Sequence, residues 1–194
     1  MFQERPSFRL PGEVIPSKYD LKLHTQSGQE LLEEDATLKF SGRVKITIKA
    51  LQDTANVTLH SKDLTIHLVK IQELDPPKET TTTTANDEME NDAEFSLVPE
   101  NDFVVITSPK QLMKDRRYVI EIHFNGSGSE GKSKGFFRAS KSVYATQFGP
   151  THARRAFPCF DEPDLKATFK ISVTCDQRFT VISNMELNSG WRNE

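Results

Sequence analysis

The feature that most restricts the fold of this chain is a strict alternation of side chains along residues 38–50. Such an alternation predicts a long strand with one buried face and one polar face, which needs partner strands in a sheet. Gly42 lies in the middle of the run and predicts a bend or a bulge there. One parity holds Leu38, Phe40, Gly42, Val44, Ile46, Ile48 and Ala50, and the other holds Lys39, Ser41, Arg43, Lys45, Thr47 and Lys49.

Shorter segments of the same kind predict the remaining strands. The chain has 38 valine, isoleucine and threonine residues against 25 alanine and leucine residues, which favours strands. No sustained apolar period of 3.6 residues occurs before residue 140, which argues against a helical bundle. We therefore expect an all-β fold built on a mixed or antiparallel sheet with one polar face. The expected strands are residues 19–23, 57–59, 64–68, 103–107, 118–124, 169–173 and 179–182.

Helical character is expected only near the C-terminal third of the chain. Thr151 is placed to cap a short helix over residues 153–156, and Pro158 would end that helix. A second helical turn is expected to begin near Glu162 and Pro163.

Length and charge limit the function further. A chain of 194 residues and 22.0 kDa favours one domain. Its formal net charge of −3 argues against a nucleic-acid-binding protein. Residues 75–94 hold seven acidic residues and one lysine, so we expect an acidic, disordered loop that joins two strands. An acidic interaction segment is the alternative.

Other features of the sequence argue against membrane insertion and a disulfide framework. No run of 18 apolar residues is present, and the first residues are too polar for a signal peptide. The two cysteines, Cys159 and Cys175, leave one bridge possible. Cys159 lies between Pro158 and Phe160, so a buried, unreactive thiol is expected.

A phosphate-binding loop is one candidate for chemistry. Residues 126–133 match the pattern G-x-x-x-x-G-K-[ST], and a predicted strand precedes them. The segment that follows does not have the pattern of the helix that phosphate binding requires. We therefore expect a flexible hairpin loop and no nucleotide partner.

The histidines and the charged segment near residue 155 are the other candidates. Each of the five histidines is expected to be an ordinary solvated side chain, with Glu121 and His123 on one face of a strand. Three or four converging ligands, as a zinc site needs, are not evident. In residues 144–169, Arg154 and Arg155 lie close to Asp161 and Glu162, which predicts an irregular segment held by charge pairs.

The same segment carries a resemblance to a known family. Residues 146–163 read TQFGPTHARRAFPCFDEP, and KATF follows at residues 166–169. This resembles the pattern T-Q-F-E-P-T-x-A-R-R-A-F-P-C-F-D-E-P of zinc aminopeptidases of the aminopeptidase N and puromycin-sensitive type. Further matches are RLP at residues 9–11, FSGRV at 40–44, GFFR at 135–138 and SNM at 183–185, so the resemblance spans nearly the whole chain.

The resemblance implies that residues 1–194 form the N-terminal β domain of such an enzyme, a large saddle-shaped sheet packed on a catalytic domain. The family's G-A-M-E-N and H-E-x-x-H motifs, which grip the substrate amine and hold zinc, are absent from this sequence. The chain alone is therefore expected to be inactive and to hold no metal, with zinc belonging to the full-length enzyme.

The resemblance also implies a contact with the N-terminus of a peptide substrate. Gln147 matches the family's pocket residue for the first substrate side chain. Gly149 stands where the family has a glutamate that helps to bind the free amine, a departure that removes this contact. The alternative function is a stand-alone, non-catalytic peptide- or protein-binding module of the same fold.

The sequence gives a further expectation about the location of the protein. Residues 56–58 and 125–127 are glycosylation sequons, which favour an extracellular or plasma-membrane-associated protein, with a cytoplasmic enzyme as the alternative.

Overall fold

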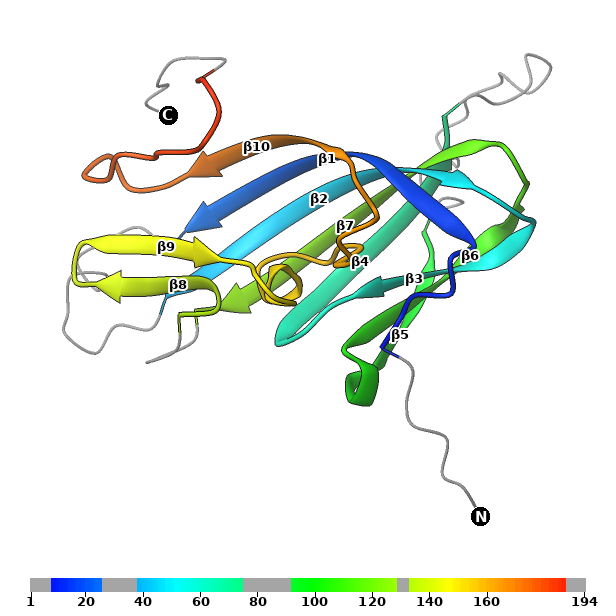
Figure 1. The fold of residues 1–194 in the computed structure, drawn as a ribbon, viewed down its shortest axis with the longest axis horizontal. Coiled ribbons are helices and arrows are strands. Elements are labelled where there is room, and N and C mark those ends of the chain that lie inside the picture. Colours follow the sequence, from blue (N-terminus) through cyan, green and yellow to red (C-terminus); the bar gives the residue numbers. More distant parts are fainter. Residues whose placement is uncertain (1–7, 26–37, 75–91, 129–132, 188–194) are drawn as a thin grey trace.

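A computed structural model describes residues 8–25, 38–74, 92–128 and 133–187. Its strands form a five-stranded sheet, a three-stranded sheet and a two-stranded hairpin, which confirms the all-β expectation. The large sheet is twisted, and the hairpin and the three-stranded sheet lie toward opposite ends of the molecule (Figure 1).

The five-stranded sheet has the order β10-β1-β2-β7-β4. All neighbouring strands in it are antiparallel except β10 and β1, which are parallel. The sheet is therefore mixed, as expected. Its strands are β1 (Val14–Thr25), β2 (Lys39–Ala50), β4 (Leu64–Glu73), β7 (Arg117–Ser127) and β10 (Thr168–Thr174).

The long alternation of residues 38–50 forms β2 in the middle of this sheet. Val44, Ile46 and Ile48 are fully buried, while Lys39 and Lys45 on the other parity are exposed. The buried face of β2 lies against β3 (Thr54–His60), β6 (Phe103–Leu112) and β5 (Glu94–Val98), which pair in the order β3-β6-β5. One apolar cluster joins the two sheets.

Gly42 does not mark a bulge, contrary to the expectation from the sequence. The register of β2 is regular at Gly42, and the shifts fall in β1 between Pro16 and Lys18 and in β4 between Ile66 and Leu68. A Cβ atom at Gly42 would lie closer than 3.0 Å to three atoms of the Phe124 ring. The glycine therefore leaves room for the aromatic ring on the neighbouring strand. Gly126 on β7 leaves room for Phe40 on β2 in the same way.

The segment after β7 confirms that the phosphate-loop pattern leads to no helix. The next described element is the strand β8 (Gly135–Ser140), which pairs with β9 (Val143–Gln147). Residues 129–132 of the pattern lie outside the described residues.

Three other expectations need correction or limits. Residues 179–182 form no strand, and residues near Pro163 form a turn. The acidic segment lies outside the described residues over 75–91, but Asp92 forms a bridge with Lys70 and Glu94 begins β5. The 3-10 helices η4 (Pro99–Asn101) and η5 (Ala153–Arg155) are the helical elements of the described residues.

The expected cap of the second of these helices is wrong. The N-cap of η5 is His152, with no side-chain hydrogen bond to the helix. Thr151 instead has a left-handed backbone (φ 60°), and its hydroxyl donates to the carbonyl of Pro150 at 2.7 Å. Thr151 thus lies one residue before the N-cap, and its hydroxyl bonds to Pro150 rather than to a nitrogen of the helix.

Candidate functional site

The two positions expected to face a substrate lie in the turn that follows β9. Gln147 is the last residue of β9 and Gly149 follows two residues later, and both are exposed. The Gln147 amide nitrogen donates to the Gly149 carbonyl at 2.9 Å, so the turn positions this side chain. The peptide bond between Gly149 and Pro150 is cis.

The backbone at Gly149 leaves open space beside it. A Cβ atom built there would meet no atom within 4 Å, and the φ angle is not in the positive range. Packing within the described residues therefore does not require glycine at this position. The first atom of a larger side chain, including that of a carboxylate residue, would have open space there.

Apolar and backbone contacts hold this turn on the domain. The Phe148 ring packs edge-on against the buried Phe157 ring, with 5.8 Å between centroids. The backbone nitrogen of His152 donates to the Phe148 carbonyl at 2.8 Å. The turn that carries Gln147 and Gly149 is thus fixed by His152 and Phe157, which follow it in the signature segment, residues 146–163.

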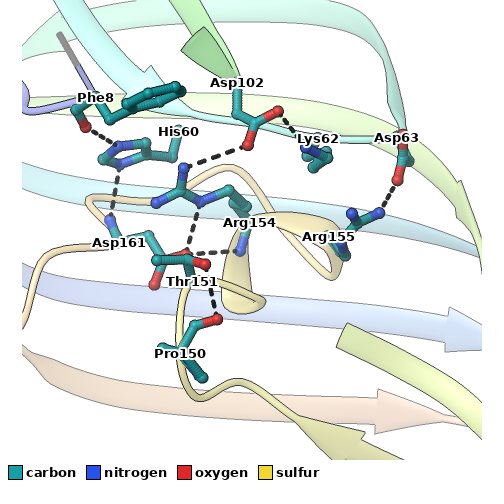
Figure 2. A network of polar contacts seen from close by, with 10 residues as sticks. All are labelled: Phe8, His60, Lys62, Asp63, Asp102, Pro150, Thr151, Arg154, Arg155 and Asp161. Carbon is teal, nitrogen blue, oxygen red and sulfur yellow. Dashed lines mark hydrogen bonds and ion pairs between the residues drawn. The ribbon is translucent and has the colours of Figure 1, made fainter. Parts of the chain in front are cut away.

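A network of charged side chains joins that segment to the rest of the domain (Figure 2). Arg154 is 4% exposed, and its Nε donates to Asp161 at 2.9 Å. A second carboxylate, Asp102, lies 3.6 Å from the same guanidinium and 2.7 Å from Lys62. Burying one guanidinium is costly unless carboxylates surround it, and here two of them do. The expected charge pair between Arg154 and Asp161 is therefore present.

Arg155 and Glu162 pair with residues outside the segment and not with charges within it. Arg155 pairs with Asp63, which precedes β4. Glu162 accepts a 2.7 Å hydrogen bond from the backbone nitrogen of Leu10 and pairs with Arg9 at 2.9 Å. These two side chains tie the signature segment to remote parts of the chain, which sequence spacing alone could not indicate.

His60 contradicts the expectation that every histidine is solvated. It is 0% exposed at the end of β3, where its backbone pairs with that of Cys159. Its Nδ1 accepts from the Asp161 backbone nitrogen at 3.2 Å, so the ring proton lies on Nε2, which donates to the Phe8 carbonyl at 3.1 Å. Burial, and to a lesser extent the nearby Arg154 charge, lower the pKa of His60 below its ordinary value. The ring is therefore neutral and bridges the N-terminal segment and the signature.

The expectation for Glu121 and His123 is confirmed. The two side chains meet on one face of β7 at 2.8 Å.

The two cysteines are both free, so no bridge joins them. Cys159 is buried, and burial raises the pKa of its thiol, as expected for an unreactive side chain.

Within the described ranges, no group of three or more histidine, cysteine, aspartate or glutamate side chains could hold a metal ion. The described residues therefore do not fit a zinc site. In the same part of the chain, no helix has the length and apolar character to cross a bilayer.

Known proteins contain a domain that is similar in sequence to this chain. The family described as the Peptidase M1 N-terminal domain matches residues 15–193. Endoplasmic reticulum aminopeptidase 1 of Homo sapiens is 34% identical over 187 residues, which cover 92% of this chain and 18% of that protein. Aminopeptidase Q of Mus musculus is 33% identical over 184 residues, 91% of this chain and 32% of that protein.

A third relative extends the match over almost all of the chain. Thyrotropin-releasing hormone-degrading ectoenzyme of Rattus norvegicus is 33% identical over 195 residues, 97% of this chain and 16% of that protein. The chain thus spans less than a third of the length of these relatives. The match to the domain over residues 15–193 shows that this chain belongs to the M1 peptidase family, as its N-terminal domain.

Proposed function

We propose that this chain forms one edge of the substrate cleft in a zinc metallo-aminopeptidase that removes N-terminal residues from peptides. The observation that carries the proposal is the exposed turn from Gln147 to Pro150, which the buried Arg154 network and Phe157 hold in place. In this proposal the catalytic domain lies outside this chain and supplies the zinc, and the chain does not hydrolyse peptides alone.

Each of the two exposed positions has its own role in the proposal. Gln147 contacts the first side chain of the substrate through its amide. Gly149 has no side chain to accept a hydrogen bond from the substrate's α-ammonium group, so this domain contributes little to amine binding. A carboxylate at position 149 would have open space around it and would accept a charge-assisted hydrogen bond from the substrate's ammonium group.

The catalytic domain has a candidate contact surface on this chain. Phe169 and Ile171 of β10 lie in register with the buried Tyr19 and Leu21 of β1, and thus on the apolar face of the sheet. Each of the two is nevertheless 51% exposed. Ile182 and Met185, 88% and 77% exposed, follow in sequence. We assign this apolar surface to packing against the catalytic domain.

The first test is the intact mass of the native protein, captured from its source with an antibody to this domain. The proposal requires a mass several times 22.0 kDa and aminopeptidase activity that a zinc chelator removes. A native mass near 22.0 kDa without activity would contradict it. That outcome would favour the second candidate, a peptide- or protein-binding module that uses the same exposed turn.

The second test addresses the turn itself. In the native enzyme, Gly149→Glu should lower KM for aminoacyl substrates by about tenfold or more, since a charge-assisted hydrogen bond contributes about 1.5–3 kcal/mol. Gly149→Gln, which adds similar volume without charge, is the matched control and should leave KM nearly unchanged. Equal effects of the two variants would exclude an electrostatic role for this position.

We also propose an extracellular or plasma-membrane-associated location. Both sequon asparagines are exposed: Asn56 on β3, and Asn125 on β7. An amidase that removes N-linked glycans should lower the mass of the native protein, and an unchanged mass would favour the cytoplasmic alternative.

A further inference from the structure

The outer face of the five-stranded sheet, which points away from the core, is strongly basic. It carries nine lysine and arginine side chains and two carboxylates, a formal charge of +7, although the whole chain has a net charge of −3. The basic residues are Lys18, Lys22, Lys39, Arg43, Lys45, Lys49, Lys70, Arg117 and Lys170, and the carboxylates are Asp20 and Glu121.

Ion pairs cancel only part of this charge. Arg43 and Lys45 share Glu121, at 3.4 and 2.8 Å, and Lys170 lies 3.9 Å from Asp20. Two further carboxylates beside the face, Asp92 and Asp115, pair with Lys70 and Lys49. Counting these two acids leaves a formal charge of +5.

Three of the lysines have no acidic partner within the described residues and are exposed: Lys18, Lys22 and Lys39. They stand at separate points of β1 and β2 rather than in one cluster. A ligand that engaged all three would have to extend across the sheet.

The register places the charges in rows across the strands. Lys22 on β1 lies opposite Arg43 on β2, and Arg43 lies opposite His123 on β7. Adjacent strands are about 4.8 Å apart, and side chains two residues apart on one strand are about 7 Å apart. Such rows match a linear ligand with anionic groups at short, regular intervals.

Several side chains between the charges are small and carry hydroxyl groups. Ser41 and Thr47 of β2 and Ser172 of β10 lie on the same face. Their hydroxyl groups can bind the hydroxyls and sulfates of a sugar chain.

The same face lacks the groups that other polyanions need. Among its described residues there is no phenylalanine, tyrosine or tryptophan, so there is no platform on which nucleic-acid bases could stack. The absence of aromatic anchors from this face also disfavours a protein partner, since protein interfaces are centred on such side chains.

We propose that the outer face of the five-stranded sheet binds a linear sulfated polysaccharide through Lys18, Lys22, Lys39 and the neighbouring basic residues. The site lies on the opposite side of the sheet from the core-facing aromatic Phe40 that contacts the β8–β9 hairpin, so it is separate from the turn at Gln147. The contacts are ionic and exposed, so salt should weaken them strongly.

The test is a calorimetric titration of the 194-residue chain with a heparin dodecasaccharide. We expect saturable binding at low salt that weakens by about tenfold or more when salt is raised to a physiological concentration. The double variant Lys18→Glu/Lys22→Glu should weaken binding by about fivefold or more, since it removes two exposed ion pairs with the ligand.

The matched control is Lys110→Glu/Lys134→Glu, which changes the net charge equally at exposed positions outside the five strands. The control should bind within about twofold of the parent chain, because its changes lie away from the face. Unchanged thermal unfolding of both variants would show that they fold.

Three results would overturn the proposal. These are no binding of the dodecasaccharide at low salt, an equal loss of affinity in the control variant, or tighter binding of oligothymidine or polyglutamate of matched charge. The last result would assign the face to a nucleic acid or to an acidic protein segment.

Discussion

Single glycine positions decide how closely the strands of this domain can approach aromatic rings. We expect Gly42→Ala to destabilise the fold by about 1–3 kcal/mol, because the added methyl group would overlap the Phe124 ring. Gly149→Ala is the matched control, since its methyl group would meet no atom, and should change stability by less than about 0.5 kcal/mol. Urea unfolding of both variants measures the difference, and equal effects would contradict the close-packing role of Gly42.

Arg154 is the buried charge on which the signature segment depends. Arg154→Ala would leave Asp161 and Asp102 without their shared cation, and we expect a loss of about 3–5 kcal/mol of stability. Arg178→Ala is the control, because that side chain pairs with Asp176 at the surface and should change stability far less. Thermal unfolding compares the two. A small effect at Arg154 would mean that its two carboxylates find other partners.

Residue-level prediction from the sequence succeeded where partners are close along the chain and failed where they are distant. The pair of Arg154 and Asp161 could be predicted because seven residues separate them. Asp63 lies 92 residues from Arg155, so only the folded chain reveals that pair. His60 also escaped prediction, because the segment that buries it, near Cys159, comes from the other end of the sequence.

At the level of elements, His60 makes the junction between β3 and the signature segment sensitive to acid. Its folded-state pKa lies below the ordinary value of about 6.5, so the unfolded chain binds a proton more readily than the folded one. The stability that neutral His60 provides is complete above that ordinary value and is lost as pH falls below it.

The measurement is the free energy of unfolding from pH 7 to pH 5. His60→Gln should unfold with a smaller dependence on pH than the parent chain over this interval, because it removes the titrating group. His24→Gln, at an exposed position on β1, should keep the parent's dependence. A parent-like pH dependence in His60→Gln would show that His60 is not the group responsible.

The sequence predicted elements well where alternation is long and one face is buried. Residues 38–50 fulfil both conditions and form β2. The strands β8 and β9 were not predicted, because their residues are mostly half-buried or exposed and carry little alternation. β5 was missed for the same reason: its residues 94–98 follow an acidic segment, and none of them is fully buried. The positions Gln147 and Gly149 came from the resemblance alone, and their role stays a prediction.

On the scale of the whole molecule, the exposed apolar surface of β10 and the segment after it should make the isolated chain self-associate. Ile171 and Ile182 are 51% and 88% exposed, and contact between two copies would remove them from water. Sedimentation velocity should show a shift to larger species with rising concentration. The variant Ile171→Lys/Ile182→Lys should reduce that shift.

A matched control for this prediction is Val143→Lys/Leu97→Lys, which changes two side chains, each 50% exposed, on other elements. It should associate like the parent chain. A parent chain that stays monomeric at high concentration would contradict both this prediction and the assignment of the surface to an interdomain contact.

The parallel pairing of β1 with β10 has a consequence for biosynthesis. Lys18 lies opposite Thr168, and the Leu10 backbone donates to Glu162, so one edge of the sheet joins segments about 150 residues apart. Contacts of such long range close large loops and slow folding. Most of this chain must therefore leave the ribosome before β1 can pair with β10. Until then the nascent domain presents an open sheet edge to chaperones and to other nascent chains.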